Sequence, residues 1–208
     1  MNARHTKSQR LLERGAIFAF ALLTAWSVWR LAVAAEWSFF PVLLVAAPIG
    51  WLASDLLSGL LHWAFDSWGS VNTPLVGNAF IRPFREHHVD PQAMTRHDFV
   101  ETHGASCLAA LPLLAATSLV PLESVAAFFA QALLLSLALG ALATNQCHKW
   151  AHMDHGSTPA AVRWAQRCRL VLPRWQHELH HTPPFDSHFC VSSGWFNAPL
   201  NALLRAWR

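Results

Sequence analysis

The chain has 208 residues, of which 53% are hydrophobic and only 13% are charged. Soluble globular domains carry about 25% charged residues, so this composition excludes an ordinary soluble domain and predicts a membrane protein. The net charge of +3 comes without a basic run interleaved with aromatic residues, which argues against a nucleic-acid partner. The four cysteines form no C-x-x-C pair, so neither a disulfide framework nor a thiol redox motif is expected.

Four apolar segments approach the length of about 20 residues that a helix needs to cross the hydrocarbon of a bilayer. They are residues 17–35, 37–61, 107–122 and 125–144. The third segment is the shortest and contains Pro112, so a kinked or re-entrant segment is an alternative there. The short link at residues 121–124 predicts a helical hairpin with the fourth segment.

Basic residues predict the orientation of these helices. Fourteen of the 15 lysines and arginines precede the first segment, lie between the second and third, or follow the fourth. The two short opposite loops contain Glu36 and Glu123 instead. The N-terminus, the middle loop and the C-terminal tail are therefore expected to face the cytoplasm, in a bacterial inner membrane. Arg30 is the exception, and it lies close enough to the outer end of the first segment to snorkel there.

A cleaved secretory signal is the alternative for residues 1–34, because basic residues precede an apolar run and Ala32-Val33-Ala34 resembles a cleavage site. The rest of the chain comprises two cytoplasmic segments, residues 66–106 and 155–208, which prolines divide into short helices and turns. Neither is expected to fold alone. The fold class is therefore an all-α membrane protein with about four transmembrane helices, in a single domain over residues 1–208.

Histidines gather on one side of the predicted membrane. Apart from His5, all of the 13 histidines lie at or beyond the cytoplasmic ends of the helices. A single histidine there would be an ordinary interfacial residue. Scattered surface histidines, however, would have no reason to avoid one side. The distribution predicts a metal site at the cytoplasmic membrane face.

Spacing within the clusters indicates which side chains can share an ion. His148 and His152 are four residues apart, so both lie on one helical face. His62 and Asp66 stand in the same relation at the end of the second segment. His87 and His88 would point about 100° apart on a helix. That arrangement suits two neighbouring ions, or one ligand beside one supporting group.

The tail adds the pattern H-x-x-H-H, in which we expect His177 and His180 to share a helical face while His181 reaches sideways. The stretch from His177 to His180 is one residue shorter than the zinc-protease motif H-E-x-x-H, which excludes that activity. A bis-histidine haem would need facing histidines inside the spans. A structural zinc site would leave half of the histidines idle. Two irons with mostly imidazole ligands would use them all.

Four polar residues near these clusters are candidates for supporting the ligands. A carboxylate or amide can fix the ring orientation and tautomer of a ligating histidine. The alternative is a solvated carboxylate or, for Asn145, a helix-end cap. The candidates are Asp66, Glu86, Asp90 and Asn145. For Asp66 we favour the supporting role.

An iron site supplied with O₂ suits oxidation of an unactivated C–H bond, and its place at the membrane face indicates a lipid chain as the substrate. Four stretches of the chain resemble the Kua-type lipid desaturase family. They are residues 55–68 (DLLSGLLHWAFDSW), 77–104 (GNAFIRPFREHHVDPQAMTRHDFVETHG), 145–152 (NQCHKWAH) and 172–197 (LPRWQHELHHTPPFDSHFCVSSGWFN). The resemblance covers most of residues 55–200.

The resemblance implies a ligand set and a cofactor. The family's histidine pattern falls on the same eight residues that spacing selects: His62, His87, His88, His148, His152, His177, His180 and His181. His103 and His188 stand outside this set, because relatives vary at both positions. The family implies a non-haem di-iron oxygenase that needs O₂ and an external electron donor, of the cytochrome b5 or ferredoxin type.

The resemblance also implies a membrane glycerophospholipid as the substrate, oxidised close to the glycerol. The implied reaction converts the 1-O-alkyl chain of plasmanylethanolamine to the 1-alkenyl chain of a plasmalogen. An acyl-lipid desaturase or hydroxylase with the same irons, acting for example on phosphatidylglycerol, is an alternative. A non-catalytic membrane metal protein is another. A basic group in the tail predicts contact with anionic lipid or, alternatively, docking of an acidic redox protein; it comprises Arg163, Arg167, Arg169 and Arg174.

Overall fold

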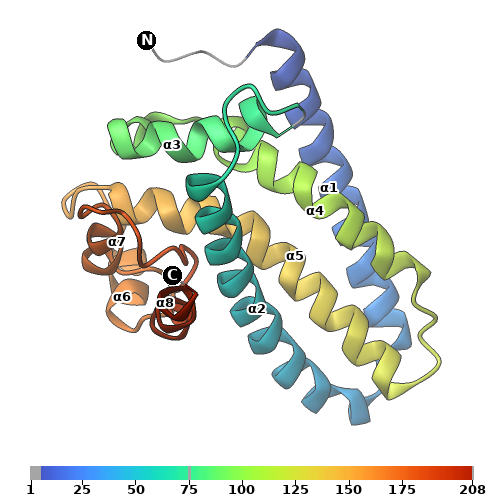
Figure 1. Cartoon of the computed structure of the whole chain (residues 1–208). Coiled ribbons are helices and arrows are strands. Elements are labelled where there is room, and N and C mark those ends of the chain that lie inside the picture. Colours follow the sequence, from blue (N-terminus) through green and yellow to red (C-terminus); the bar gives the residue numbers. More distant parts are fainter. Residues whose placement is uncertain (1–5, 75, 208) are drawn as a thin grey trace. The chain divides into compact units, whose positions relative to one another are not determined.

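The computed structural model describes residues 6–74 and 76–207, and every regular element among them is helical (Figure 1). The α-helices are α1 (Lys7–Ala34), α2 (Phe40–Ser67), α3 (Arg82–Val89), α4 (Phe99–Leu119), α5 (Val125–His152), α6 (Ala160–Arg167), α7 (Arg174–His180) and α8 (Asn197–Ala206). Two 3₁₀ turns (Trp37–Phe39 and Ala93–Arg96) and one π-helical turn (Gly77–Ile81) lie between them.

Four of these helices, α1, α2, α4 and α5, are long and apolar enough to cross a membrane, which confirms the four predicted spans. The helices extend further into polar sequence than hydropathy predicts. Helix α1 begins at Lys7 because the Thr6 hydroxyl accepts the backbone N–H of Gln9 (3.2 Å). Helix α4 is one continuous 21-residue helix with Pro112 inside it, long enough to cross without being re-entrant.

The start of α4 is stabilised by charge. Asp98 and Glu101 form a capping box, in which each side chain accepts the backbone N–H of the other residue. The Arg10 guanidinium of α1 donates to both carboxylates, at 2.5 Å from Asp98 and 3.1 Å from Glu101. These contacts explain why α4 begins at Phe99, earlier than the predicted start of the third span.

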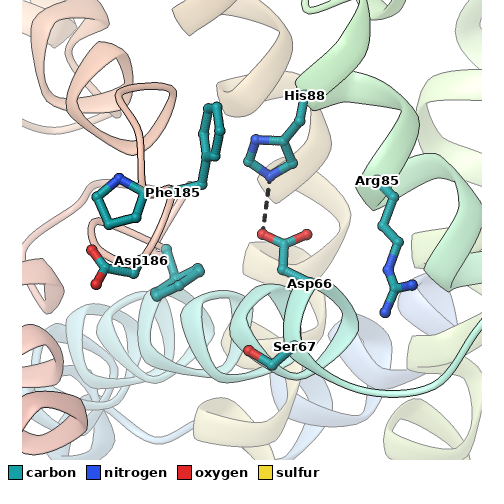
Figure 2. Close-up of a pocket in the computed structure, with 8 residues that line it drawn as sticks. Asp66, Ser67, Arg85, His88, Phe185 and Asp186 are labelled. Carbon is teal, nitrogen blue, oxygen red and sulfur yellow. Dashed lines mark hydrogen bonds and ion pairs between the residues drawn. The ribbon is translucent and has the colours of Figure 1, made fainter. Parts of the chain in front are cut away.

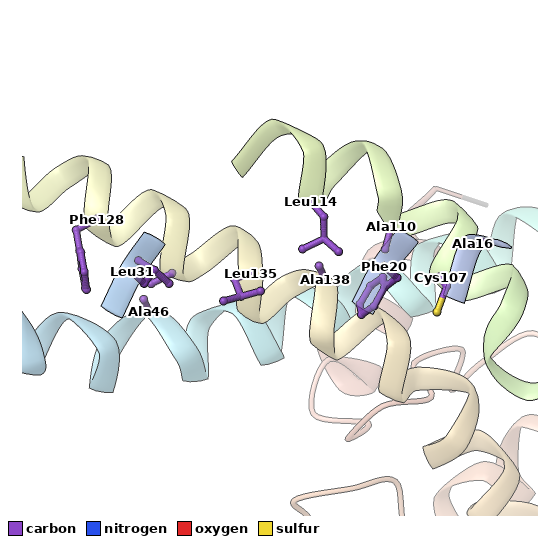
Figure 3. Packing of buried hydrophobic residues seen from close by; sticks show 11 residues of the cluster. Ala16, Phe20, Leu31, Ala46, Cys107, Ala110, Leu114, Phe128, Leu135 and Ala138 are labelled. Atoms are coloured by element: carbon purple, nitrogen blue, oxygen red, sulfur yellow. The ribbon is translucent and has the colours of Figure 1, made fainter. Parts of the chain in front are cut away.

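The chain divides into two compact units. So far as their residues are described, one comprises Met1–Ser54 and Asp98–Ala143, and the other comprises Asp55–His97 and Thr144–Arg208. Helices α2 and α5 contribute residues to both units. Within the first unit α1 packs along α4 (Figure 1). Its buried core is apolar and includes Phe20, Leu114, Phe128 and Leu135 (Figure 3).

Arg30, the one basic residue outside the charge pattern, has backbone partners in the first unit. Its guanidinium donates to the carbonyls of Thr117 (2.7 Å) and Val120 (2.5 Å) at the C-terminal end of α4. The Ser27 and Thr117 hydroxyls lie 2.7 Å apart. The last carbonyls of a helix have no partners within the helix, so Arg30 satisfies groups that the bilayer could not.

Small residues bring α2 and α5 close together in the same unit. A Cβ added at Gly50 would lie 2.5 Å from the Ser136 Cβ, and one added at Gly140 would overlap the Ser54 side chain. The Ser136 hydroxyl also donates to the carbonyl of Ala47 (2.7 Å). Close approach at small residues is the usual way in which membrane helices pack. Residue numbers rise together along both partners, so the two helices run parallel, as the predicted topology requires.

In the second unit an arginine attaches α3 to the end of α2. The Arg85 side chain of α3 donates to the carbonyls of Phe65 (3.3 Å), Trp68 (3.2 Å) and Gly69 (2.9 Å). The Phe65 carbonyl lies in the last turn of α2, and Trp68 and Gly69 directly follow the helix. Arg85 therefore determines where the following His87 is placed relative to His62 and Asp66.

Candidate metal centre

The eight predicted ligands all lie in the second unit, where they form two groups of converging ring nitrogens. In each group one nitrogen per ring lies within 4.8 Å of the others. The five-histidine group consists of His87, His148, His152, His177 and His181. The four-histidine group consists of His62, His87, His88 and His180. His87 belongs to both, so the two groups are neighbours.

In the five-histidine group three Nε2 atoms lie within hydrogen-bond distance of one another, but they cannot all be hydrogen-bonded. The Nε2 of His177 lies 2.8 Å from those of His148 and His152, which are 3.2 Å from each other. Each Nε2 either carries a proton or bears a lone pair. Among three such atoms, at least two are in the same state, and two donors or two acceptors cannot form a hydrogen bond with each other. The three contacts therefore cannot all be hydrogen bonds.

A cation removes this conflict, because every Nε2 can then direct its lone pair at the same centre. Imidazole nitrogens lie about 2.0–2.1 Å from a bound Zn²⁺, so two ligands at a right angle are about 3.0 Å apart. The observed separations, including 3.1 Å between the Nε2 atoms of His181 and His177, agree with that value. The five-histidine group therefore fits a metal ion.

In the four-histidine group a carboxylate takes part. The Asp66 Oδ2 lies 3.3 Å from the Nε2 of His62, 3.1 Å from that of His88 and 3.6 Å from that of His180. Among the described residues, the buried Nε2 atoms of His62, His87 and His180 have no hydrogen-bond partner. Buried polar atoms without partners are rare. Their convergence fits a second metal ion here.

Backbone carbonyls orient three of these rings. The acceptors are Phe189 O for His62 (3.0 Å), Ser187 O for His180 (2.8 Å) and Phe84 O for His87, each bonded to Nδ1. A carbonyl can only accept, so Nδ1 carries the proton and Nε2 bears the lone pair. The backbone thus sets the tautomer that a metal ligand requires.

Burial keeps the imidazoles of His87, His177, His180 and His181 neutral. Desolvation, reinforced by the neighbouring rings, holds the pKa of His87 and that of His177 well below the usual value. The same causes lower the pKa of His181 to about 4. Burial, partly offset by the Ser187 carbonyl, lowers the pKa of His180 to about 3. Lone pairs are therefore available to a metal at neutral pH.

These shifts predict that acid destabilises the metal-free protein. Below the unfolded-state pKa of about 6.5, the unfolded chain binds protons at His180 and His181 that the folded chain does not bind. The free energy of unfolding therefore falls as the pH drops from 6.5 toward 4, and is unaffected above pH 7.5. We expect the unfolding midpoint to fall by at least about 5 °C between pH 7 and pH 5, measured by tryptophan fluorescence. The midpoint of the control variant His155→Gln, which changes an exposed histidine, should fall by the same amount. A wild-type midpoint that does not change between pH 7 and pH 5 would contradict the lowered pKa values of His180 and His181.

A cavity of about 370 Å³ opens beside the four-histidine group. Figure 2 shows the bonded pair Asp66 and His88 between Arg85 on one side and Asp186 on the other. Phe185 and Phe189 form apolar walls. Both phenylalanine rings contact histidines. The ring centroids of Phe185 and His88 lie 5.2 Å apart, and those of Phe189 and His180 lie 5.1 Å apart. A ligand in this cavity would meet Asp66 and His88 directly.

The structure divides the tail histidines between the two groups, which their spacing did not predict. His177 and His181 share the five-histidine group, while His180 belongs to the four-histidine group. The prediction that His177 and His180 share a helical face did not say which ion each ring would serve, and the structure places the two rings in different groups. The helix ends at His180, and the i, i+4 relation places His181 near His177 in spite of that. The tail therefore contributes to both groups.

The structure places only some of the other candidates near these groups. Asp66 is at the centre of the four-histidine group, whereas Glu86 lies 3.9 Å from Arg82, and Asp90 pairs with Arg96 at 2.9 Å. Neither of these two carboxylates is brought to a histidine. The supporting role of Asn145 stays a prediction. His103 and His188 lie outside both groups, as expected.

Sequence reasoning missed the backbone acceptors and the role of Asp55. This carboxylate is fully buried and accepts four backbone N–H groups from residues 192–196. The sequence did contain a signal for Asp55, because an ionisable residue within an apolar span usually has a functional role or a specific partner. Carbonyl acceptors leave no trace in a side-chain pattern.

Comparison with known proteins identifies relatives of the chain. The chain is 44% identical over 194 residues to a plasmanylethanolamine desaturase of Myxococcus xanthus (92% of this chain, 67% of the relative). It is 39% identical over 213 residues to plasmanylethanolamine desaturase 1 of Mus musculus (99% and 77%). A chloroplastic fatty acid desaturase 4 of Arabidopsis thaliana is 33% identical over 160 residues (76% and 47%). No solved structure matches the chain.

The model of the lipid desaturase domain matches residues 51–208. That range includes all eight histidines of the two groups and Asp66. The matched region covers most of the chain, and the relatives extend the similarity over nearly all of it. The chain belongs to the lipid desaturase family.

Proposed function

We propose that the chain is an O₂-dependent plasmanylethanolamine desaturase with two non-haem irons held by its eight clustered histidines. The observation that carries the proposal is the convergence of two all-imidazole groups that share His87. The names of the two relatives at 44% and 39% identity support the substrate.

The residues suggest how two ions are shared. His148, His152, His177 and His181 would hold one ion, His62, His88 and His180 the other, and His87 is within reach of both. Asp66 supplies a carboxylate to the second. Imidazole suits iron as well as zinc, but zinc has no redox chemistry. A desaturation therefore requires a redox-active metal at these ligands, and iron is the metal that we propose.

The proposed reaction balances with one O₂ and two external electrons. Bound iron, supplied with these, provides an oxidant that can remove hydrogen from an alkyl chain. Overall, R–O–CH₂–CH₂–R′, O₂, two electrons and two protons give R–O–CH=CH–R′ and two waters. The chain's own residues keep the ligand rings neutral and oriented.

The cavity beside Asp66 and His88 is the proposed approach for the lipid. Its volume of about 370 Å³ lies within the usual range of ligand sites. Phe185 and Phe189 can pack against the first carbons of a lipid chain. Arg85 and Asp186 also line the cavity and can contact the polar groups of the lipid. The bond oxidised would then be close to the glycerol linkage.

The proposal includes a location and a partner. The histidine groups would face the cytoplasm from a bacterial inner membrane, because 14 of the 15 basic residues fall on that predicted side. An electron-donor protein of the cytochrome b5 or ferredoxin type would supply the two electrons. The substrate would be drawn from the surrounding bilayer. The single-domain organisation over residues 1–208 is part of the same proposal.

The test is lipid conversion in a host that makes no plasmalogens. Cells expressing the chain and fed a 1-O-alkyl lipid should accumulate a 1-alkenyl lipid that releases a fatty aldehyde in mild acid. The yield should require O₂ and disappear in the His148→Ala variant, since that ring is central to the five-histidine group.

Other products would identify other activities. An untouched alkyl lipid, with phosphatidylglycerol gaining a double bond near its acyl carbonyl, would establish the acyl desaturase, in line with the Arabidopsis thaliana relative. A hydroxylated chain would establish a hydroxylase. No change in any lipid, with a competent electron donor present, would contradict an enzymatic role.

A further inference from the structure

Asp55 is a buried charge away from the proposed ligands. Its side chain is fully buried on α2. The Oδ1 atom accepts the backbone N–H groups of Ser192 (3.1 Å), Ser193 (2.7 Å) and Gly194 (2.9 Å), and Oδ2 accepts that of Phe196 (3.1 Å). Charge-assisted hydrogen bonds of this kind offset the cost of burying a carboxylate.

These four donors belong to one segment, residues 187–197, which we call the strap. The strap is attached to α2 a second time, because Val191 donates its N–H to the Ser58 hydroxyl (3.1 Å), and that hydroxyl donates to the carbonyl of Asp55 (2.7 Å). It is also attached to α7, where Gln176 donates to the carbonyl of Gly194 (2.8 Å). Gly194 has a positive φ of 77°, a conformation that favours glycine.

The other end of the strap orients two rings of the four-histidine group. Phe189 O accepts the Nδ1–H of His62 at 3.0 Å, and Ser187 O accepts that of His180 at 2.8 Å. Both rings are fully buried. Any displacement of the strap from α2 moves both acceptors, and with them the direction of both Nε2 lone pairs.

We propose that Asp55 is a positioning residue for the four-histidine group, acting through the strap on His62 and His180. Within the described part of the chain, the hydrogen bonds of its carboxylate go to the strap and not to a proposed ligand. Its removal selectively weakens the binding of the ion at the four-histidine group. The five-histidine group keeps its ion, because the strap carbonyls, among the residues that the structure describes, orient only His62 and His180, which are outside that group. This inference rests on the metal centre of the proposed function.

A carboxylate suits this position because both of its oxygens can accept hydrogen bonds from backbone N–H groups. In Asp55→Asn one oxygen becomes an NH₂ group, which would face a backbone N–H whichever way the amide is turned. The strap would lose at least one hydrogen bond and acquire a donor facing a donor. The change in volume is small, so the variant tests the hydrogen bonds and not the packing.

The experiment uses the full-length chain in detergent, stripped of metal and titrated with Fe²⁺ without O₂, and in parallel with Co²⁺ as an optical probe. Wild-type protein should bind two ions per chain. Asp55→Asn should bind one ion with wild-type affinity and the other about 10–100-fold more weakly, with a single set of Co²⁺ absorption bands retained.

A second measurement needs no metal. Hydrogen exchange of the backbone amides at residues 192–196 should be slow in wild-type protein and faster in Asp55→Asn. The matched control is Asp98→Asn, which removes another carboxylate that accepts a backbone N–H, at the start of α4. The Asp98→Asn variant should bind both ions as wild type does, and its amides at residues 192–196 should still exchange slowly. If Asp55→Asn fails to fold, Ser58→Ala, which removes the other attachment to α2, should weaken the same ion.

The outcomes are distinct. Two ions bound with equal affinity by wild type and by Asp55→Asn, while the strap amides exchange faster, would overturn the role of Asp55 alone. Equal weakening of both ions would also overturn it, since the effect would then not be selective. Wild-type protein that binds neither ion would overturn the proposed metal centre, and this inference with it.

Discussion

His87→Ala should reduce vinyl ether formation by more than about 100-fold, a larger loss than supporting residues usually cause. His87 is the histidine common to both groups, and its Nδ1–H is bonded to the carbonyl of Phe84, so its Nε2 is directed at the centre. Iron bound per chain should fall in the same variant, because both groups lose a nitrogen. Lipid analysis and elemental analysis of the purified protein measure the two effects.

The matched control is His155→Ala, which removes an exposed histidine outside both groups. Its iron content and product yield should equal those of wild type. Both variants should insert into the membrane normally, because neither side chain packs in the apolar core of the spans. Near-normal product formation by His87→Ala would show that the shared position is not a ligand.

Gly140→Leu should greatly reduce the yield of folded protein. A Cβ at this position already overlaps the Ser54 side chain, so a larger residue must push α5 away from α2. Overpacking of this kind costs about 1–3 kcal/mol in soluble cores, and the lost contacts of a close helix pair add to it. Thermal unfolding in detergent, monitored by the intrinsic tryptophan fluorescence, measures the effect.

Gly15→Leu is the control for a glycine in a candidate spanning helix. In the described part of the chain, no atom outside the neighbouring residues and backbone of its own helix lies within 4 Å of a Cβ added there, so this variant should match wild type in yield and midpoint. Equal midpoints for both leucine variants would mean that the small-residue contact between α2 and α5 contributes little. The reciprocal change Gly50→Leu should resemble Gly140→Leu, because its Cβ would meet Ser136.

The main features of the fold could be predicted from sequence because a bilayer allows few alternatives. Runs of apolar residues predicted four spans, and the structure has four helices of suitable length. Helix ends were harder, since they depend on partners distant in sequence. The start of α4 at Phe99 depends on the capping box at Asp98 and on Arg10 of α1, and neither contact appears in a hydropathy profile.

The candidate site could be predicted as a set of residues but not as an arrangement. Periodicity placed His148 beside His152 because both stand on one long helix. It could not assign His177 and His180 to different groups, because both lie on the short helix α7, which ends at His180. The backbone acceptors at Phe189 and Ser187 were beyond reach of any side-chain pattern, because every residue has a carbonyl.

The phenylalanine rings around the four-histidine group have a consequence for oxidative self-damage. Phenylalanine gives up an electron far less readily than tyrosine or tryptophan. The chain contains no tyrosine, and the ring contacts of His62, His88 and His180 in the described part of the chain involve only phenylalanines and other histidines. An oxidant formed without substrate would therefore find no easily oxidised ring in contact with it. Under the proposed function, loss of an electron from a neighbouring ring should therefore be slower here than at a site lined by tyrosine or tryptophan.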